Sequence, residues 1–346
     1  MAYTTIDDPT AYFNTLLYTG NGASSRDLTF SANAGNFQAD WLWFKQRSQS
    51  SRSHNVYDSV RGNSQRIETD NTGAEEEQTG LHKTFNTNGF TIGAGNIVNE
   101  NNQTFVTWGW KAGGSASSNT DGGITSSVSV NQDAGFSIAT WTGTGSTATI
   151  GHGLNAVPKV IITKARSDAY DWYTYHASIG NTKAIYLNLT NAESGASANF
   201  WNNTTPTSSV WTAGGNVFNN NYTFVTYAFA EKQGYSKFGS YTGNGSADGT
   251  FVYLGFKPAF VMIKSSSNSG QSWVIQDNKR DGFNYNNHRL FANSSGAEET
   301  TVRMDLLSNG FKCRDNDGNG NGFSYIYMAF AEQPLVTSSG VPATAR

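Results

Sequence analysis

Cysteine is almost absent from this chain of 346 residues, and Cys313 alone cannot form a disulfide within it. Charge is scarce too, because Asp, Glu, Lys and Arg make up 14% of the residues, against about 25% in an ordinary soluble domain. The formal net charge is −3, and nucleic acid or an anionic membrane surface requires clustered basic residues instead. We therefore expect no nucleic acid among the partners and no disulfide framework.

Long apolar runs are also missing. No segment approaches the roughly 20 apolar residues of a membrane span, so we expect no membrane insertion. The N-terminus shows no basic segment followed by an apolar one, which argues against a signal peptide. No long apolar stripe follows the helical period either, so helix should be scarce.

Motifs for catalysis are absent as well. The sequence has no Gly-x-Ser-x-Gly elbow, and its five histidines are scattered without the spacing of zinc ligands. Cys313 follows Phe311 in an expected strand, where a buried, inert thiol is the ordinary outcome. The sequence therefore predicts a protein that is not an enzyme.

The chain does contain a short phrase that occurs three times. Tyr-Thr-Gly-Asn-Gly at residues 18–22 returns at 241–245, and in the form Trp-Thr-Gly-Thr-Gly at 141–145. An apolar run that ends in lysine follows each copy, and a late aromatic segment closes each unit. The second and third copies lie 100 positions apart, a period as long as a domain. The lysines are Lys45, Lys164 and Lys264, and the closing segments are 104–110, 223–229 and 324–330.

Short aromatic and β-branched segments between Gly, Asn and Ser clusters are typical of antiparallel β-sandwiches. The apolar run at residues 41–44 does not alternate, which predicts a central strand covered on both faces. The predicted fold is all-β, with three tandem antiparallel β-sandwich repeats of the concanavalin or jelly-roll type. The predicted parts are an N-terminal arm (1–15; a frayed end or a strand that docks on a neighbouring subunit), repeat 1 (16–112), a Gly/Ser-rich linker whose end is a candidate edge strand (113–135), repeat 2 (136–232), repeat 3 (235–334) and a C-terminal tail (335–346).

Two acidic patterns recur in the first and third repeats. An Asp with an Arg three residues later occurs as Asp58 and Arg61 and again in repeat 3, whereas repeat 2 has His176 in place of the Asp. We interpret this pattern as a local ion pair or an Arg-anchored turn. Adjacent glutamates at 75–76 and 298–299 point to opposite faces of a strand, so they cannot flank one sugar bond. We expect them in solvated turns.

One segment matches the first half of a calcium-binding loop. Residues 315–321 place oxygen-bearing side chains at loop positions 1, 3, 5 and 7. The twelfth position is Ile326 instead of the usual glutamate. Two interpretations stay open: a hairpin loop of turn-forming residues, or a weak Ca²⁺ site, with no other cofactor expected. The candidate metal ligands are Asp315, Asp317, Asn319 and Asn321.

Aromatic residues are the remaining signal. Nine Trp and 16 Tyr beside an Asn/Ser/Thr-rich surface are typical of sugar-binding sandwiches, and equally of a well-packed sandwich core. We assign the strand tryptophans Trp41, Trp43, Trp108 and Trp110 to the core. Aromatic residues near Asn-rich or Gly-rich loops are the candidate glycan contacts: Trp201, Trp211, Tyr170 and Tyr285.

Several phrases resemble a family of repeat-built virion proteins from marine bacteriophages. They are the repeated openings, Asp-Ser-Val-Arg-Gly at 58–62, Gly-Tyr-Ser-Lys-Phe-Gly-Ser-Tyr-Thr-Gly-Asn-Gly at 234–245, and the ending from Ala329 to Arg346. The resemblance covers nearly the whole chain and implies lectin-like sandwiches of the concanavalin type.

The resemblance implies a tail-fibre-like structural protein, made in the host cytoplasm and exposed on the virion, where several weak sites together bind host surface glycans. Its partners would be other virion proteins, a host glycan and further copies of itself. The alternative is a capsid decoration, head-fibre or tail accessory protein with a purely structural role.

Overall fold

The computed structural model describes residues 3–31, 37–218 and 221–344. Strands dominate it, and the helical elements in these residues are a single 3-10 turn, η1 (Pro9–Ala11), and one short helix, α1 (Ala198–Trp201). The prediction of an all-β fold with little helix is confirmed. No described helix has the length and apolar character that crossing a membrane would require.

Residues of the first repeat form one six-stranded antiparallel sheet and one three-stranded sheet. The six-stranded sheet has the order β1-β9-β3-β4-β5-β6, and the smaller one has the order β2-β8-β7. Their bounds are β1 (Phe13–Thr19), β2 (Arg26–Thr29), β3 (Trp41–Gln46), β4 (Asn55–Asp58), β5 (Gly62–Glu68), β6 (Glu76–Glu77), β7 (His82–Asn86), β8 (Gly89–Ile92) and β9 (Thr104–Trp110).

The second repeat forms a seven-stranded sheet of order β10-β11-β12-β18-β14-β15-β16 and a two-stranded sheet, β13-β17. The first two strands come from the Gly/Ser-rich linker. The strand predicted at the end of the linker is β11, but β10 and not β11 forms the edge of the sheet. The bounds are β10 (Ser117–Asn119), β11 (Ser126–Asn131), β12 (Phe136–Thr142), β13 (Ala148–Gly151), β14 (Val160–Ala165), β15 (Tyr173–His176), β16 (Ile185–Tyr186), β17 (Val210–Ala213) and β18 (Thr223–Phe229).

The third repeat forms one eight-stranded sheet, β19-β26-β21-β22-β23-β24-β25-β20. The last four strands of this order include β20 and β25, whose positions along the repeat match those of β13 and β17 in repeat 2. The bounds are β19 (Ser236–Thr242), β20 (Phe251–Tyr253), β21 (Phe256–Ser265), β22 (Val274–Asp277), β23 (Asn286–Phe291), β24 (Glu299–Leu307), β25 (Gly310–Cys313) and β26 (Ser324–Pro334).

The three large sheets share one strand order and one register. In each sheet the closing aromatic strand (β9, β18 or β26) lies between two others. On one side is the opening strand (β1, β12 or β19), and on the other is the strand that contains the repeated lysine, here called the lysine strand (β3, β14 or β21). Trp41, Val160 and Phe260 hold the same place, because each pairs both with the end of the closing strand and with the acidic or histidine position on the next strand. Asp58, His176 and Asp277 are therefore structurally equivalent, as their sequence alignment predicts.

Each lysine strand is buried on both faces because its side chains alternate between two cores. In β3, Trp41 and Trp43 enter one cluster, which contains residues of all three repeats. Leu42 and Phe44 point the other way, into a cluster made of repeat 1 residues. The same division holds in the other two repeats. The prediction of a central strand covered on both faces is confirmed.

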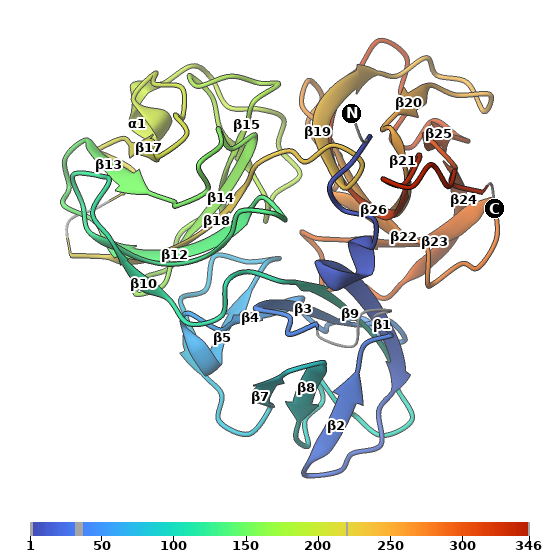
Figure 1. Ribbon diagram of the computed structural model, residues 1–346, viewed down its shortest axis with the longest axis horizontal. Coiled ribbons are helices and arrows are strands. Elements are labelled where there is room, and N and C mark those ends of the chain that lie inside the picture. Colours follow the sequence, from blue (N-terminus) through green and yellow to red (C-terminus); the bar gives the residue numbers. More distant parts are fainter. Residues whose placement is uncertain (1–2, 32–36, 219–220, 345–346) are drawn as a thin grey trace.

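The cluster that all three repeats share, here called the central core, joins them into one body. Figure 1 shows three lobes whose large sheets face a common centre. Trp41 of repeat 1 stacks on Tyr227 of repeat 2 with ring centroids 4.4 Å apart, and Phe13 stacks on Phe330 of repeat 3 at 5.5 Å. The prediction of three separate tandem sandwiches therefore stays a prediction, because one face of each large sheet packs against the other repeats.

The described part of the predicted N-terminal arm docks on its own chain. Thr4 and Ile6 are buried, and the Thr4 hydroxyl donates a hydrogen bond of 2.9 Å to the carbonyl of Gln233. Asp7 accepts hydrogen bonds from the backbone N–H and the hydroxyl of Ser338, so the segment before β1 contacts the segment after β26. Strand β1 begins at Phe13, which places the end of the arm inside the first sheet.

A loop of each repeat also holds the end of the lysine strand in the next repeat, a contact we call the clasp. In each clasp the backbone N–H of a glutamate donates to a carbonyl two residues after the lysine, and the lysine Nζ donates to a carbonyl of the loop. Repeat 1 holds repeat 2, repeat 2 holds repeat 3, and repeat 3 holds repeat 1, so the ring closes. The bonds are Glu75 N to Arg166 O (2.8 Å), Glu193 N to Ser266 O (2.9 Å), Glu298 N to Arg47 O (2.8 Å), Lys164 to Thr72 O (3.2 Å), Lys264 to Thr190 O (3.0 Å) and Lys45 to Ser295 O (3.2 Å).

Two of the clasps contain buried ion pairs. Glu75 bonds both Arg61 of its own repeat and Arg166 of the next, and Glu298 does the same with Arg280 and Arg47. The Glu75 and Glu298 side chains are 10% and 8% exposed. The prediction that these two glutamates lie in solvated turns is wrong. Each forms an ion pair with an arginine of another repeat, and the sequence alone does not show that contact.

Burial in the clasps lowers the pKa of all three lysines, Lys45, Lys164 and Lys264, to about 8. In the unfolded chain a lysine keeps its proton to about pH 10.4, so between pH 8 and 10 the unfolded state binds more protons. The free energy of unfolding should therefore rise as the pH goes from 7.5 to 9.5. Urea unfolding at the two pH values measures this.

The variant Lys264→Met should make that rise clearly smaller, since it removes one of the three lysines whose pKa is lowered. A free energy of unfolding that falls between pH 7.5 and 9.5 would contradict the lowered pKa of the three lysines. If the variant and the wild-type protein showed the same dependence on pH, Lys264 would not contribute to the rise.

Candidate functional site

Two of the four predicted glycan contacts are core residues. Trp201 and Trp211 are each 1% exposed, and their rings pack edge to face with centroids 5.8 Å apart. Trp201 lies on α1 and donates its indole N–H to the carbonyl of Lys183 at 2.7 Å. The prediction that they contact glycan is wrong, because the Asn-rich segment around them folds over the end of repeat 2 and turns both rings inward.

Tyr170 is half-buried in the loop between β14 and β15. Its ring centroid lies 5.6 Å from that of Tyr222. A hydrogen bond to Asp168 raises the pKa of Tyr222. Tyr170 therefore remains a candidate contact, but its ring already has a neighbour.

Tyr285 is the predicted contact that the structure leaves open to solvent. It is 56% exposed, and Phe283 beside it is 83% exposed. A shallow cavity of about 430 Å³ adjoins the tyrosine, lined also by Asn284, Asp305 and Arg314. Exposed large aromatic residues are otherwise rare on this protein, which makes this place distinctive.

The strands of repeat 3 fix the polar groups of this cavity. Both polar atoms of the Asn284 side chain bond the backbone of Leu306, at 2.8 and 2.9 Å, which ties the Tyr285 loop to β24. Asp305 on the same strand accepts from the Nε of Arg314 at 2.6 Å. The Arg314 side chain is still 35% exposed, and its Nη1 lies 3.6 Å from Asp248, a residue whose side chain is 80% exposed.

Two more aromatic rings stand on the same sheet face. Phe251 pairs with Lys312, and Lys312 pairs with Asp305, so the three side chains form one row across β20, β25 and β24. Tyr253 lies two residues after Phe251 and therefore on the same face. The two rings are 44% and 49% exposed.

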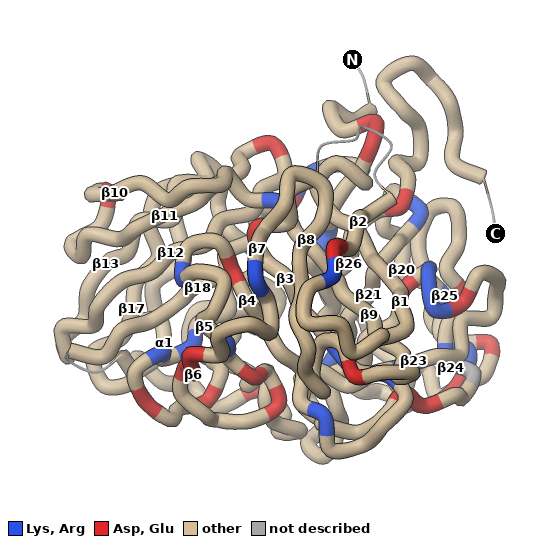
Figure 2. The backbone as a smooth tube through the Cα atoms, turned by 90° about the horizontal axis from the view of Figure 1, so that it is seen from below, with Lys and Arg blue, Asp and Glu red and all other residues tan. Residues whose placement is uncertain are grey.

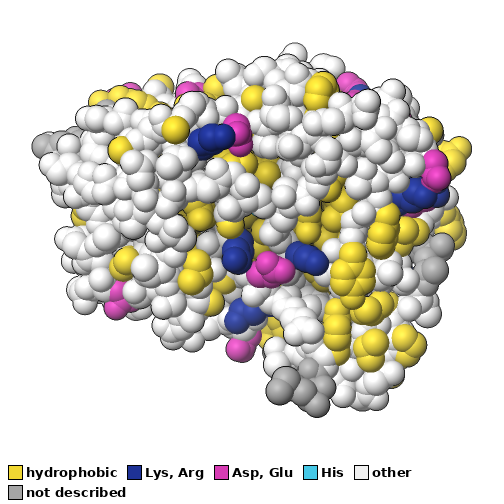
Figure 3. Space-filling view, turned by 90° about the horizontal axis from the view of Figure 1, so that it is seen from above, with side chains coloured by type: hydrophobic (Ala, Val, Ile, Leu, Met, Phe, Trp, Pro, Cys, Tyr) yellow, Lys and Arg dark blue, Asp and Glu magenta, His cyan; other side chains and the backbone are white. Residues whose placement is uncertain are grey.

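We call this surface the repeat 3 face; it comprises Phe251, Tyr253, Phe283, Tyr285, Asp305, Lys312 and Arg314. Figure 3 shows hydrophobic side chains gathering on the side of the molecule that repeat 3 forms. Phe251, Tyr253 and Phe283 are not among the contacts predicted from the sequence. The alternation of Phe251 and Tyr253 around the buried Val252 was the available signal, since it is the pattern of a strand with one face in solvent.

The candidate calcium ligands have protein partners. Asp315 pairs with Arg303 and Asp317 with Arg289. Within the described ranges, no group of three or more His, Cys, Asp or Glu side chains could hold a metal ion. The segment joins β25 to β26 in different parts of the sheet, so it is not a hairpin between neighbouring strands.

The two asparagines of that segment differ in role. Asn321 is exposed, whereas Asn319 is fully buried and donates to Asn244 and to the carbonyl of Ser246 at 2.7 and 2.9 Å. Asn319 thus fixes the opening phrase of its repeat. Asn99 performs the same task in repeat 1, where its side chain accepts from the backbone N–H of Asn21 at 3.0 Å.

Charged residues are sparse over the whole molecule, and basic and acidic positions lie next to each other in several places (Figure 2). Cys313 is buried in β25 as the sequence predicts, and burial raises the pKa of its thiol to about 11. A thiol in this state is a poor nucleophile.

Among known proteins, the chain matches one family model. A family model described as "Domain of unknown function (DUF7483)" matches residues 8–334. No curated protein matches the chain, and no solved structure matches it.

Proposed function

The chain belongs to the DUF7483 family, whose function is unknown, and we propose that it is a non-enzymatic structural protein of a bacteriophage virion. In this proposal it is tail-fibre-like, exposed on the particle, and contacts glycans on the host surface. Its partners are other virion proteins, the host glycan and further copies of the same chain. The resemblance of several sequence phrases to virion proteins of marine bacteriophages supports the assignment to a particle.

The observation that carries the glycan part is the exposure of Tyr285 beside the Asp305–Arg314 pair. Aromatic rings pack against the apolar faces of sugar rings, and a neighbouring carboxylate and guanidinium bond the hydroxyls. Asp305 is the one carboxylate among the described residues that line the cavity, whereas glycoside hydrolysis usually employs two. This arrangement supports binding without cleavage.

A purely structural role, as a capsid decoration, head-fibre or tail accessory protein, is the second candidate. The closed ring of clasps favours it, because a rigid body with paired charges can serve as a contact surface without any ligand. Immunogold labelling of particles separates tail from capsid positions.

Tyr285→Ala should lower the signal of the neutral glycans bound on an array by roughly tenfold or more, because a central aromatic contact typically carries about 2 kcal/mol of binding. Val157→Ala is the matched control, since Val157 is 42% exposed on repeat 2, and it should leave the signals unchanged. Equal binding by all three proteins would exclude the repeat 3 face. Binding to no glycan by the wild-type protein would favour the structural role.

A further inference from the structure

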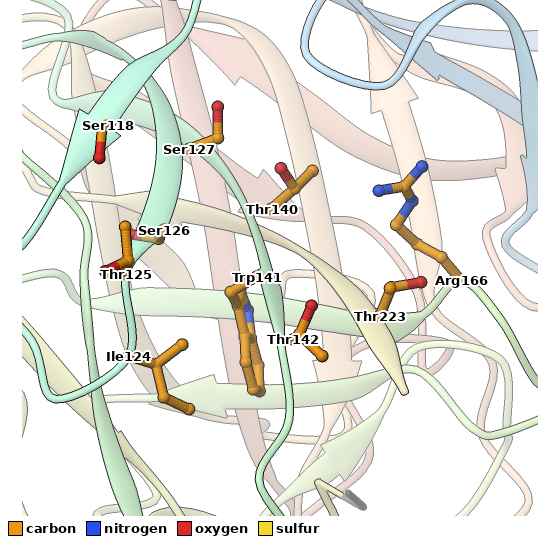
Figure 4. Close-up of a pocket in the computed structure, with 10 residues that line it drawn as sticks. All are labelled: Ser118, Ile124, Thr125, Ser126, Ser127, Thr140, Trp141, Thr142, Arg166 and Thr223. Atoms are coloured by element: carbon orange, nitrogen blue, oxygen red, sulfur yellow. The ribbon is translucent and has the colours of Figure 1, made fainter. Parts of the chain in front are cut away.

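A second hollow lies on repeat 2, at the edge that the former linker builds. The β11–β12 ladder ends at the pair Ser127–Thr140, although β12 continues to Thr142. A cleft of about 360 Å³ opens where the β10–β11 hairpin separates from β12 (Figure 4). Seven of its ten lining residues are Ser or Thr. Its size suits one or two sugar residues.

Strand pairing places a row of hydroxyl groups on one face of the sheet. Ser127 pairs with Thr140, and Thr142 pairs with Thr223. Thr140 and Thr142 lie two residues apart on β12, so all four point to the same side. Within the described part of the chain, the Ser127, Thr140 and Thr142 hydroxyls form no hydrogen bond with other protein groups. A hydroxyl both donates and accepts, as the hydroxyls of a sugar do.

Arg166 stands at the end of this row (Figure 4), where its backbone N–H bonds the carbonyl of Thr223 at 2.7 Å. Its Nε and Nη2 bond Glu75 at 2.9 and 2.8 Å, which leaves Nη1 without a carboxylate partner among the described residues. Glu75 is also bonded to Arg61 at 2.9 Å. Arg61 is also paired with Asp58 at 2.5 Å, so its charge does not depend on Glu75 alone. The Nη1 group of Arg166, whose side chain is 23% exposed, is the donor that can bond a ligand carboxylate.

We propose that this cleft binds an acidic saccharide of one or two residues, with the ligand carboxylate at Arg166 and the ring hydroxyls along Ser127, Thr140 and Thr142. The inference rests on the proposed glycan binding and adds a second site with its own ligand class. Trp141 lines the cleft but is only 4% exposed. The cleft thus lacks the ring platform on which neutral sugars stack, and its selectivity comes from charge and hydroxyls.

The test is calorimetric titration of the full chain with two disaccharides. One ends in a hexuronic acid, and the other carries the corresponding neutral hexose. The acidic disaccharide should bind more tightly, by roughly tenfold, because a hydrogen bond to a charged group contributes more than a neutral one. Arg166→Gln should abolish this preference, and Thr140→Val with Thr142→Val should weaken both sugars by roughly tenfold. Thr29→Val, an exposed strand threonine of repeat 1, is the control and should change neither.

Arg166→Gln also breaks a clasp ion pair, so the threonine double variant, which leaves the clasp intact, decides the matter if the arginine variant does not fold. Equal affinity for the two sugars in the wild-type protein would overturn the inference. So would binding that the threonine changes leave intact but Tyr285→Ala removes. That last result would still support the proposed function, because it moves the site to the repeat 3 face.

Discussion

Asp277→Ala is expected to lower the free energy of unfolding by about 3–5 kcal/mol, because it takes from the buried Arg280 guanidinium the nearer of its two carboxylate partners. Both side chains of the Asp277–Arg280 pair are 0% exposed, and the two groups lie 2.6 Å apart. Asp277 also accepts the indole N–H of Trp108 at 3.0 Å, which joins repeat 3 to repeat 1. Urea unfolding monitored by circular dichroism measures the change.

The protonation of Asp277 supports this expectation. Burial alone would raise the pKa of its carboxyl group, but the charge of Arg280 and the hydrogen bonds around it hold that pKa below the ordinary value. The group is therefore ionised near neutral pH. Asp27→Ala, at an exposed strand position of repeat 1, is the control and should leave the unfolding midpoint nearly unchanged. Equal midpoints for both variants would show that the buried pair does not stabilise the contact between the repeats.

Trp41→Ala should cost about 3–5 kcal/mol of unfolding free energy as well, since it removes a large side chain from a closely packed core. Trp41 is 1% exposed and lies against Trp110 at 4.6 Å and Tyr227 at 4.4 Å, so its loss weakens two repeats together. Repeats 1 and 2 should then still unfold in one transition. Urea unfolding followed by near-ultraviolet circular dichroism checks this.

Tyr285→Ala removes an aromatic ring of similar kind from the surface and is the comparison. It should shift the unfolding midpoint little. A Trp41→Ala protein that unfolds in two steps, with one repeat lost before the others, would contradict the shared core.

The all-β fold could be predicted because its signals are local. Each strand carries β-branched and aromatic residues between turn residues, and the unbroken apolar run at Trp41 indicates cover on both faces. The sequence does not say what provides that cover. On the side of β3 that carries Trp41 and Trp43, the other two repeats provide it, and contacts between segments a hundred residues apart leave no periodic pattern.

The site was predicted less completely for the same reason. Trp211 and Tyr285 lie in similar Asn-rich or Gly-rich surroundings, yet one is buried and the other exposed. The difference depends on whether the chain closes over the ring, which is a tertiary effect. Glu75 likewise resembles a turn residue until Arg166 of the next repeat is brought against it. The repeat 2 cleft depends on a linker that becomes two strands.

The three repeats form a single body around the central core and a closed ring of clasps. Differential scanning calorimetry of the intact chain tests this most directly, through the ratio of the calorimetric to the van't Hoff enthalpy of unfolding. One cooperative body predicts a ratio of about 1. A ratio of about 3, as for three domains that unfold independently, would contradict it.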